Sequence, residues 1–270
     1  MVVTGAASGI GAACAAGLDA GGWRVIRIDI VSEGCDIVAD LSTADGRQDA
    51  VDQTSRRCGG SLAGIVTCAG LAGSPHRPGA VVTSLNYFGT VVVLEGLRSL
   101  LLPGTAAVAI SSNSTTVQPE IPNALVDACL ADDEPLARRL ADECGSLLAY
   151  PASKLAVAHW VRREATGDAW AGSGLRLNAI APGMIDTPMI AEMRGDPETA
   201  PMLDLLPIPL GRAGRPEEIA AVVDFLLGPN GSFFCGSVLF CDGGSDALLR
   251  TRDWPAAWDI SVRQFGRQRS

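Results

Sequence analysis

The sequence predicts an α/β fold, a single domain in which a doubly wound parallel sheet of seven strands carries helices on both faces. Short β-branched runs alternate with longer helical stretches along most of the 270 residues. The runs are continuously apolar, which is typical of parallel strands buried on both faces. No linker and no internal repeat interrupts this alternation, and 270 residues can bury the core of one such domain. Right-handed crossovers between successive strands then give the doubly wound arrangement.

The first part of the chain supplies three of the expected strands. Residues 2–4 are β-branched and predict the first strand, and the alanine-rich residues 10–20 predict a helix after a glycine-rich turn. Residues 24–28 and 37–39 are apolar runs and predict the second and third strands. Residues 44–57 have a helical composition and predict the next helix.

The remaining elements repeat the same alternation. A long apolar stretch at residues 80–101 predicts a helix between strands at residues 64–67 and 106–110. Residues 149–170 predict a further helix before a sixth strand at residues 175–180. The last helix and the seventh strand are expected at residues 216–227 and 237–240.

The stretch at residues 119–146, before the helix that follows the fifth strand, does not fit this alternation. It holds seven acidic and two basic residues, so it carries −5 of the formal net charge of −9. Asp133 followed by Pro135 is typical of a helix start. We expect two short helices that form an acidic insert, and a solvated loop is the alternative.

The tail at residues 250–270 follows the expected domain of residues 1–249. Its apolar residues recur at i, i+4, i+8 and i+11, the spacing of one helix face. They are Trp254, Trp258, Val262 and Phe265. We expect a short amphipathic helix that covers the substrate cleft or packs on a partner subunit, and a frayed tail is the alternative.

Charge and composition exclude several function classes. The chain has 21 basic and 30 acidic residues and shows no basic patch of the kind that binds nucleic acid or an anionic membrane surface. Its first 22 residues are apolar but small and lack a preceding Lys or Arg, so we expect them to belong to the fold. The eight cysteines form no C-x-x-C pair and the two histidines are isolated, so no metal site is expected. Reduced thiols then predict a cytoplasmic protein.

A glycine-rich turn links the expected first strand to the first helix. Glycines at this point permit a tight turn and a close approach of the backbone to a pyrophosphate, which the free N–H groups of the helix then face. A glycine pattern alone is a weak signal, and its place between strand and helix makes it informative. The expected phosphate-binding residues are Gly5, Ser8, Gly9, Ile10 and Gly11.

Asp29 ends the expected second strand, 18 residues after Gly11. A carboxylate there can accept hydrogen bonds from both adenosine ribose hydroxyls, and it repels a 2′-phosphate. The glycine turn has no basic residue to hold that phosphate. Both features favour NAD over NADP, although Arg24 and Arg27 lie nearby, and a surface acid at a strand end is the alternative.

Tyr150 and Lys154 give the sharpest chemical signal. Lys154 is the one lysine among 21 basic residues, and Tyr150 is one of two tyrosines. Residues i and i+4 share one face of a helix, so the phenol and the ammonium are expected to point into one cleft. The positive charge is expected to lower the pKa of the tyrosine from its ordinary value of about 10 and to make it an acid or base near neutral pH. A surface Tyr–Lys pair without a catalytic role is the alternative.

These motifs resemble the classical short-chain dehydrogenase/reductase family. The glycine turn, Tyr150-Pro-Ala-Ser-Lys154, Leu177-Asn-Ala-Ile-Ala-Pro-Gly183 and Asp242-Gly-Gly244 stand in the family's order, and the resemblance covers residues 1–244. Within the family, the chain is similar to the bacterial 3α-hydroxysteroid dehydrogenase/carbonyl reductase branch. The segments that carry this similarity are Ala39-Asp-Leu-Ser-Thr43, Cys68-Ala-Gly70, Asn86-Tyr-Phe-Gly89, the insert before Tyr150 and Gly243-Gly-Ser-Asp-Ala247. The resemblance implies a Rossmann fold, NAD as cofactor and oxidoreductase activity.

The resemblance also implies four catalytic residues. Tyr150 matches the family's acid/base, and Lys154 matches the residue that lowers its pKa and binds the nicotinamide ribose. Ser112 matches the serine that holds the substrate oxygen, with Ser111 as the rival and Ser114 as a weaker alternative. Asn86 matches the asparagine that positions a proton-relay water, and a hydrogen bond at a helix kink is its alternative role.

A further set of residues is implied to surround the dinucleotide. Thr67 and Cys68 replace the two asparagines of the family's Asn-Asn-Ala-Gly motif, which removes a side chain that normally braces the central strands. The backbone contact to the cofactor needs only the Ala-Gly pair, and Thr187 is expected to reach the nicotinamide carboxamide. The implied contacts are Asp40 and Leu41 at the adenine, and Ala69, Gly70, Pro182, Gly183, Ile185 and Thr187.

Apart from Met1, every methionine lies between residues 184 and 202. In the short-chain dehydrogenase/reductase family, which this chain resembles, the corresponding stretch is the mobile lid over the substrate. Methionine is flexible and polarisable and suits an adaptable apolar surface. We therefore expect a large apolar substrate that contacts Met184 and Met189, with ordinary helix packing as the alternative.

The expected function is NAD-dependent interconversion of a secondary alcohol and a ketone, with a hydroxysteroid or a similar apolar cyclic molecule as substrate. The same chemistry on a terpene alcohol or a xenobiotic carbonyl is an alternative. A non-catalytic NAD-sensing scaffold is another, although such family members usually lose the tyrosine or the lysine. Family members usually pair through helices that correspond to residues 80–101 and 149–170, so a homodimer or homotetramer is expected. The acidic insert adjoins the second helix and can block that mode, which leaves another surface for pairing.

Overall fold

The computed structural model describes residues 1–254 and residue 256. Its strands are β1 (Val2–Thr4), β2 (Ile26–Asp29), β3 (Ile37–Val38), β4 (Leu62–Thr67), β5 (Leu101–Ile110), β6 (Arg176–Pro182) and β7 (Val238–Cys241). The longer helices are α1 (Gly9–Ala20), α2 (Ala44–Arg57), α4 (Gly89–Arg98), α7 (Glu134–Cys144), α8 (Ser146–Glu164) and α11 (Pro216–Leu227). The shorter ones are α3 (Gly79–Thr83), α5 (Ser114–Val117), α6 (Asn123–Leu130), α9 (Pro188–Gly195), α10 (Ala200–Asp204) and α12 (Ser245–Leu249).

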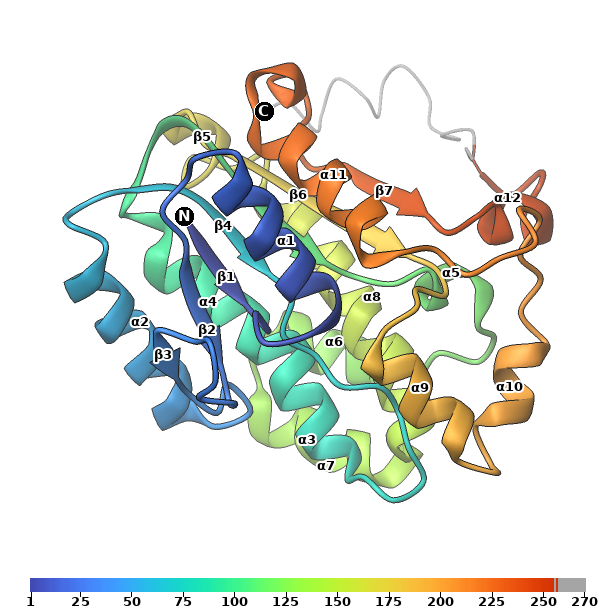
Figure 1. The fold of residues 1–270 in the computed structure, drawn as a ribbon. Helices are drawn as coiled ribbons and strands as arrows, with labels where there is room; N and C mark the ends of the chain where they lie inside the picture. The colour runs from blue at the N-terminus through green and yellow to red at the C-terminus, as the bar shows by residue number, and fades with distance from the viewer. Residues whose placement is uncertain (255, 257–270) are drawn as a thin grey trace, which may run out of the picture.

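All strands join one parallel sheet in the order β3-β2-β1-β4-β5-β6-β7, with helices on both faces (Figure 1). The expected fold class is therefore confirmed. The strand order reverses at β1, which pairs with β2 on one side and with β4 on the other. Connections leave the sheet toward opposite faces at such a switch point, and the crevice at the strands' carboxyl ends is where open α/β sheets bind ligands.

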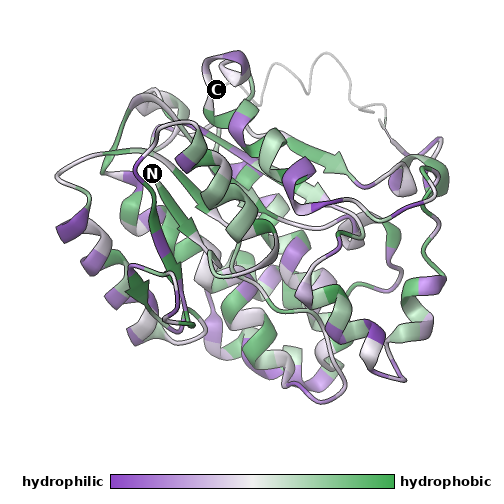
Figure 2. Ribbon diagram, in the orientation of Figure 1, coloured by the Kyte–Doolittle hydropathy of each residue, from purple (hydrophilic) through white to green (hydrophobic). Residues whose placement is uncertain are grey.

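The two faces of the sheet bury two separate cores. Val2 of β1 packs in one core with Leu94 of α4 and Trp160 of α8. Its neighbour Val3 points to the opposite face and packs with Val223 of α11 in the other core. Because both faces are covered, the strands are apolar at most positions, and Figure 2 shows them as mostly hydrophobic ribbons.

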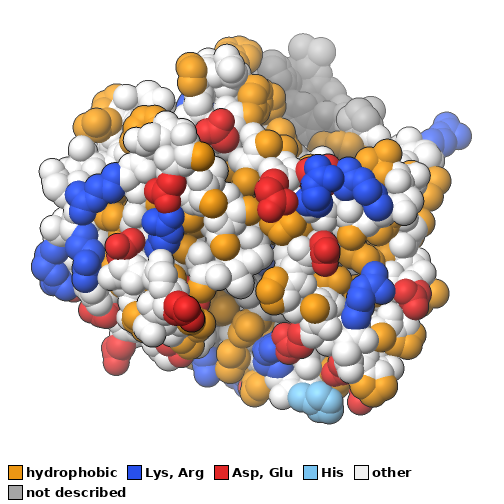
Figure 3. All heavy atoms as spheres, in the orientation of Figure 1, with side chains coloured by type: hydrophobic (Ala, Val, Ile, Leu, Met, Phe, Trp, Pro, Cys, Tyr) orange, Lys and Arg blue, Asp and Glu red, His pale blue; other side chains and the backbone are white. Residues whose placement is uncertain are grey.

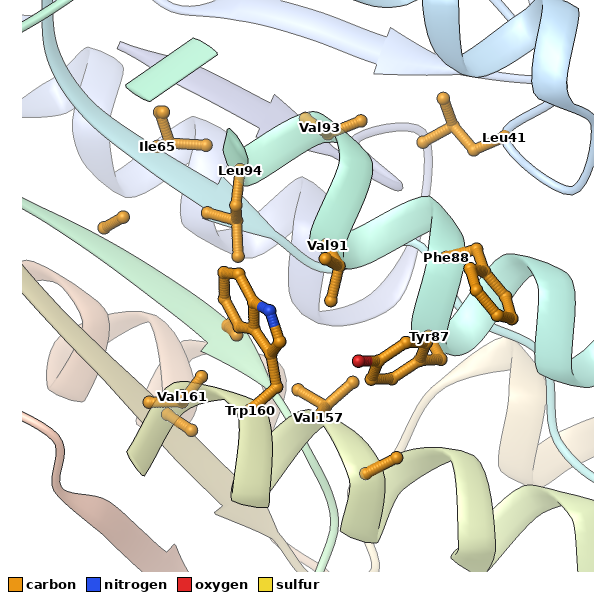
Figure 4. Close-up of a cluster of buried hydrophobic side chains, with 14 of the residues drawn as sticks. Leu41, Ile65, Tyr87, Phe88, Val91, Val93, Leu94, Val157, Trp160 and Val161 are labelled. Atoms are coloured by element: carbon orange, nitrogen blue, oxygen red, sulfur yellow. The ribbon is translucent and has the colours of Figure 1, made fainter. Parts of the chain in front are cut away.

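The larger core includes one of the two tyrosines. In Figure 4, Trp160 and Val157 of α8 face Tyr87, Val91 and Leu94, which lie on and just before α4. Tyr87 is only 2% exposed. It is a packing residue, which leaves Tyr150 as the tyrosine available for chemistry.

The helix expected at residues 80–101 is not continuous. After α3, a π-helical turn spans Ser84–Phe88, and α4 then continues to Arg98. Asn86 lies in this turn, and its side-chain Oδ1 accepts a hydrogen bond from the Leu71 N–H at 2.8 Å. π-Helical turns of this kind are frequent at functional sites. The π-helical turn directs the Asn86 side chain toward the loop that follows β4. This agrees with the alternative role of Asn86, a hydrogen bond at a helix kink.

Other element boundaries also differ from the expected ones. Strand β5 begins at Leu101 rather than at residue 106, because Leu101 pairs with Leu62 across an irregularity and regular pairing resumes at Ala106. Helix α8 begins at Ser146 and ends at Glu164, short of the expected residue 170.

Within the described residues, one helical stretch, Gly79–Arg98, is long and apolar enough to cross a membrane by length and composition. Of its apolar window, 72% is buried inside the protein, so the stretch is a core element of this fold. The face seen in Figure 3 carries Lys and Arg side chains interspersed with Asp and Glu, and no single sign of charge dominates it.

Two helices, α6 and α7, lie within residues 119–146. Leu125 and Cys129 of α6 and Ala137 and Ala141 of α7 are buried in the larger core. Of the seven acidic residues of the insert, six are exposed and Glu134 is half-buried. The insert is thus packed on the domain by its apolar residues.

Of the residues that define the expected tail helix, Trp254 is 54% exposed. Trp258, Val262 and Phe265 lie outside the residues that the structure describes.

Candidate active site

A cleft of about 520 Å³ opens at the carboxyl ends of the central strands. All residues expected to bind the cofactor line it, drawn from the segments that follow β1 to β6. They are Gly5, Ser8, Gly9, Ile10, Gly11, Asp29, Asp40, Leu41, Ala69, Gly70, Tyr150, Lys154, Pro182, Gly183, Ile185 and Thr187. Over the part of the chain that the structure describes, no group of three or more His, Cys, Asp or Glu residues is placed to hold a metal ion.

The glycine turn forms a cradle without side chains. Gly5 and Gly9 have left-handed backbones with φ of 65° and 52°. A Cβ on Gly5 would lie 2.7 Å from the Ala69 nitrogen, and a Cβ on Gly11 would lie 2.0 Å from the Gly5 carbonyl oxygen. Helix α1 starts after Ser8 with no acidic residue in its first turn. Free N–H groups at a helix start beside a bare backbone suit a pyrophosphate, so these residues fit a dinucleotide.

Substitution of Gly11 by alanine is expected to destabilise this turn. The added Cβ would meet the Gly5 carbonyl at 2.0 Å, so the backbone must move, at a cost of about 1–3 kcal/mol in the free energy of unfolding. Gly17→Ala is the matched control on the same helix, because its Cβ would meet nothing within 4 Å. That control is expected to gain about 0.5–1 kcal/mol from helix propensity. Thermal unfolding of both variants checks this, and equal stabilities would contradict it.

Asp29 lies beside the glycine turn, where β2 ends. Its Oδ2 accepts a hydrogen bond from the Ala7 N–H at 3.0 Å, and its Oδ1 accepts one from the Val31 N–H at 3.1 Å. The carboxylate is held against the glycine turn, and each oxygen keeps capacity for a further donor.

The two arginines near Asp29 are engaged elsewhere. Arg27 pairs with Asp19, and Arg24 donates to the Arg57 carbonyl at 3.2 Å. Among the described residues that line the cleft, Lys154 is the only cation. No described basic side chain therefore lines the adenine end.

Tyr150 and Ser112 meet at the inner end of the cleft. Both residues line the cavity, and the Ser112 side chain lies close enough to lower the pKa of Tyr150. Ser112 Oγ also accepts from the Ser114 N–H at 3.1 Å, which fixes its orientation. The hydroxyl of the rival Ser111 is already engaged, because it donates to the Lys154 carbonyl at 2.9 Å. The geometry favours Ser112 over Ser111 as the serine that meets a substrate oxygen.

Tyr150 lies in the first part of α8, at a point where the helix lacks one backbone donor. Pro151 has no N–H, so the Leu147 carbonyl loses its helical partner. Gln118 Nε2 donates to that carbonyl at 3.4 Å. Ser153 Oγ donates to the Tyr150 carbonyl at 2.7 Å. Side chains thus stabilise the turn that presents the phenol.

Lys154 is buried, and its Nζ donates to the carbonyl of Ile110 at 2.9 Å, where β5 ends. Burial lowers the pKa of the Lys154 ammonium to about 8. Burial raises the pKa of the Tyr150 hydroxyl, and the nearby Ser112 side chain lowers it in part. This direction is opposite to the one expected from the Tyr–Lys spacing. The reason is desolvation, which disfavours the phenolate and the ammonium alike.

Asn86 and Lys154 converge over Gly70. A Cβ on Gly70 would lie 3.1 Å from Asn86 Oδ1 and 3.3 Å from Lys154 Nζ. Asn86 Nδ2 donates to the Leu71 carbonyl at 3.0 Å and to Ser153 Oγ at 3.3 Å. Its Oδ1 accepts one hydrogen bond, from Leu71, and so retains one lone pair. Asn86 holds the loop after β4 and also faces the space beside Lys154.

Thr4 provides the bracing between central strands that the replaced asparagines would provide. Its Oγ1 accepts hydrogen bonds from the N–H groups of Cys68 and Ala69, both at 3.1 Å. The side chains that stand in place of the asparagines do not link the strands in this way. Thr67 Oγ1 is buried without a partner, and Cys68 packs against the core cluster that contains Cys14.

Of the two methionines expected at the substrate, Met189 lines the cleft and Met184 does not. Met184 Sδ instead accepts a hydrogen bond from Arg194 of α9 at 3.4 Å. Met184 thus lies outside the lining of this cleft, and its contact with a substrate stays a prediction.

Sequence reasoning missed a group of apolar residues in the cleft wall, namely Ile30, Val31, Leu71, Val81 and Leu85. Val81 and Leu85 are one helical turn apart, a spacing that could have placed them on one face. Ile30 and Val31 follow Asp29 directly and are 63% and 49% exposed. Two apolar residues directly after an acid at the end of a strand could have predicted an apolar surface for the adenine.

The chain is similar to known proteins over most of its length. A family model described as enoyl-(acyl carrier protein) reductase matches residues 5–246. The chain is 38% identical to the 3-alpha-hydroxysteroid dehydrogenase/carbonyl reductase of Comamonas testosteroni, over 93% of this chain and 97% of that protein. It is 34% identical to the cis-4-hydroxycyclohexanecarboxylate dehydrogenase of Sinomonas cyclohexanicum, over 92% and 96%.

A solved structure is also similar over nearly the whole length. It is the 3-alpha-hydroxysteroid dehydrogenase from Pseudomonas sp. B-0831 complexed with NADH, with a TM-score of 0.87, 43% sequence identity, and coverage of 93% of this chain and 98% of that one. Together with the glycine turn and the Tyr150–Lys154 motif, these similarities show that the chain belongs to the short-chain dehydrogenase/reductase family of oxidoreductases.

Proposed function

We propose that the protein is an NAD(H)-dependent oxidoreductase that interconverts a secondary alcohol and a ketone. The observation that carries this proposal is the Tyr150–Ser112 hydroxyl pair at the inner end of a cleft that also holds the glycine cradle. When bound, a nicotinamide dinucleotide supplies the group that accepts or donates the hydride. The solved structure of the similar Pseudomonas enzyme, which is complexed with NADH, supports this choice of cofactor.

In this proposal, the substrate oxygen lies between the hydroxyls of Ser112 and Tyr150. Ser112 donates a hydrogen bond to that oxygen and holds it in place while its charge changes. In alcohol oxidation, Tyr150 removes the hydroxyl proton as a phenolate, and in ketone reduction it returns a proton as a phenol. The raised pKa of Tyr150 favours the phenol in the protein alone.

The proton then needs a route out of the buried site. Lys154 suits this task, because burial brings its pKa to about 8 and its Nζ faces the space over Gly70. Asn86 Oδ1 borders the same space and retains a lone pair. We infer that the proton passes from Tyr150 to Lys154 and across this space to a water held by Asn86.

A preference for NAD over NADP follows from the charges at the adenine end. Asp29 would accept hydrogen bonds from the ribose hydroxyls and repel a 2′-phosphate. Asp29→Ala is expected to narrow the ratio of kcat/KM for NAD over NADP by about tenfold, which is about 1.4 kcal/mol. Initial rates with both cofactors measure this ratio. An unchanged ratio would remove Asp29 from the account of cofactor choice.

The substrate class in this proposal is a hydroxysteroid or a similar apolar cyclic alcohol. The apolar cleft residues Val81, Leu85, Met189 and Ile190 support it, and so do the two relatives named for 3-alpha-hydroxysteroids. A small cyclic alcohol is the second candidate, supported by the relative named for a hydroxycyclohexanecarboxylate.

The test is NADH formation by the purified protein with a 3α-hydroxysteroid and, separately, with cyclohexanol. Tyr150→Phe is the blank in both assays. Steroid turnover that disappears in the blank is the expected result. Turnover of cyclohexanol alone would keep the chemistry and reject the steroid, and NADH binding without any turnover would favour a non-catalytic role.

A further inference from the structure

The guanidinium of Arg47 is buried among three segments that are far apart in the sequence. Arg47 lies on α2, and its side chain is only 4% exposed. Its Nη1 and Nη2 donate to Glu134 Oε1 and Oε2 at 3.2 and 2.5 Å, so the pair is bidentate. Glu134 is the first residue of α7 in the acidic insert. The guanidinium also lies 5.9 Å from the centre of the Phe88 ring, in the π-helical turn.

The same guanidinium reaches the adenine end of the cleft. Arg47 Nη1 donates to the Leu41 carbonyl at 3.4 Å. Leu41 belongs to the adenine loop, which we define as residues 40–42, all of which line the cleft. Gly89 packs against the same carbonyl, since a Cβ on Gly89 would lie 3.1 Å from it. The backbone of the adenine loop is thus held between Arg47 and the start of α4.

We propose that the Arg47–Glu134 pair positions the adenine loop, so that the acidic insert determines the affinity for the adenine half of the cofactor. This inference rests on the proposed function, because the loop has this task only if the cleft binds a dinucleotide. Without Glu134 the guanidinium would be a buried and unpaired charge, and it would move toward solvent. The Leu41 carbonyl would then lose its donor, and the loop would lose its fixed position.

The form of the pair fits a positioning task better than a stabilising one. Buried ion pairs add little stability compared with apolar residues of the same volume. A planar guanidinium that binds a carboxylate through two hydrogen bonds allows only one relative orientation. The pair therefore fixes the position of α2 relative to α7. Asp132, Asp133 and Glu143 of the insert are exposed, whereas Glu134 is directed inward and its side chain is 23% exposed.

The test uses Glu134→Gln, which removes the charge and keeps the shape of the side chain. Dissociation constants for NADH, ADP-ribose and nicotinamide mononucleotide are measured by calorimetry, together with the thermal unfolding temperature. NADH and ADP-ribose are expected to bind about 5- to 10-fold more weakly, since both carry the adenine. Nicotinamide mononucleotide lacks the adenine, and its dissociation constant is expected not to change. The kcat at saturating NAD is expected to stay within about 2-fold.

Glu143→Gln is the matched control on the same helix. Glu143 forms an exposed pair with Arg139 at 3.6 Å, and both side chains are more than 60% exposed. This control is expected to bind all three nucleotides as the unmodified protein does. Arg47→Lys is the second variant, because it keeps the charge and loses the planar fork; a smaller weakening of the same two nucleotides is expected.

Selective weakening of NADH and ADP-ribose supports the proposal. A lower unfolding temperature with unchanged dissociation constants would overturn it and make the pair purely structural. Equal weakening of all three nucleotides would also overturn it, because it would mean general damage to the cleft. If the unmodified protein bound no NADH, the proposed function itself would fail, and that outcome is visible before any variant is made.

Discussion

Replacement of Tyr150 by phenylalanine is expected to lower kcat for alcohol oxidation by about 10²- to 10⁴-fold, the range for loss of a general acid–base group. The change removes one oxygen atom, which lies near Ser112 in the cleft. The aromatic ring keeps its packing. NADH should bind with a dissociation constant within about 2-fold of the unmodified value, because the lost group acts in the transition state rather than in binding. Steady-state rates and a fluorescence titration with NADH measure the two effects.

The chain contains a matched control for this substitution, because it has only one other tyrosine. Tyr87→Phe also removes one phenolic oxygen, but from the core rather than from the cleft, so turnover should be retained. That variant leaves Tyr150 as the one titrating phenol. Its ultraviolet absorbance should show a pKa above the ordinary tyrosine value, because burial raises it. Near-normal turnover in Tyr150→Phe would remove this residue from the mechanism.

The sequence was most informative where a signal lies within a few consecutive residues. The glycine turn between Thr4 and Gly11 and the i, i+4 spacing of Tyr150 and Lys154 are local patterns, and all of these residues line or border the cleft. The strands were found for a similar reason, since a strand buried on both faces must be apolar throughout. Such patterns fix where the carboxyl ends of the strands lie, and the cleft follows from that.

Features that depend on distant contacts could not be predicted from local patterns. The π-helical turn forms where Asn86 bonds to Leu71, which is 15 residues away. The Arg47–Glu134 pair joins residues that are 87 positions apart, and no periodicity records it. The pKa of Tyr150 depends on how much water the fold removes from the phenol, and residue spacing does not measure that quantity.

Lys154→Met is expected to lower kcat by about 10²-fold or more, because the buried ammonium beside Gly70 is lost from the proton route. Arginine is expected not to rescue the activity. Its planar guanidinium cannot replace a compact ammonium that donates to the Ile110 carbonyl at 2.9 Å. The composition supports this expectation, since Lys154 is the single lysine and the other 20 of the 21 Lys and Arg residues are arginine. Rates of Lys154→Arg close to those of the unmodified protein would contradict this reasoning.

The methionine variant also reveals the burial of Lys154 through the pH dependence of stability. Burial lowers the pKa from 10.5 to about 8, so the unfolded chain holds this proton more tightly than the folded protein does. Below pH 8 both states carry the proton and the cost to the folded state is constant. Between pH 8 and pH 10.5 the folded state releases the proton first, so the unmodified protein gains stability relative to Lys154→Met.

The difference in unfolding free energy between the unmodified protein and Lys154→Met should change by on the order of 3 kcal/mol across this window. No other lysine titrates there, because Lys154 is the single one. A difference that stays constant with pH would mean that the ammonium keeps its ordinary pKa in the fold.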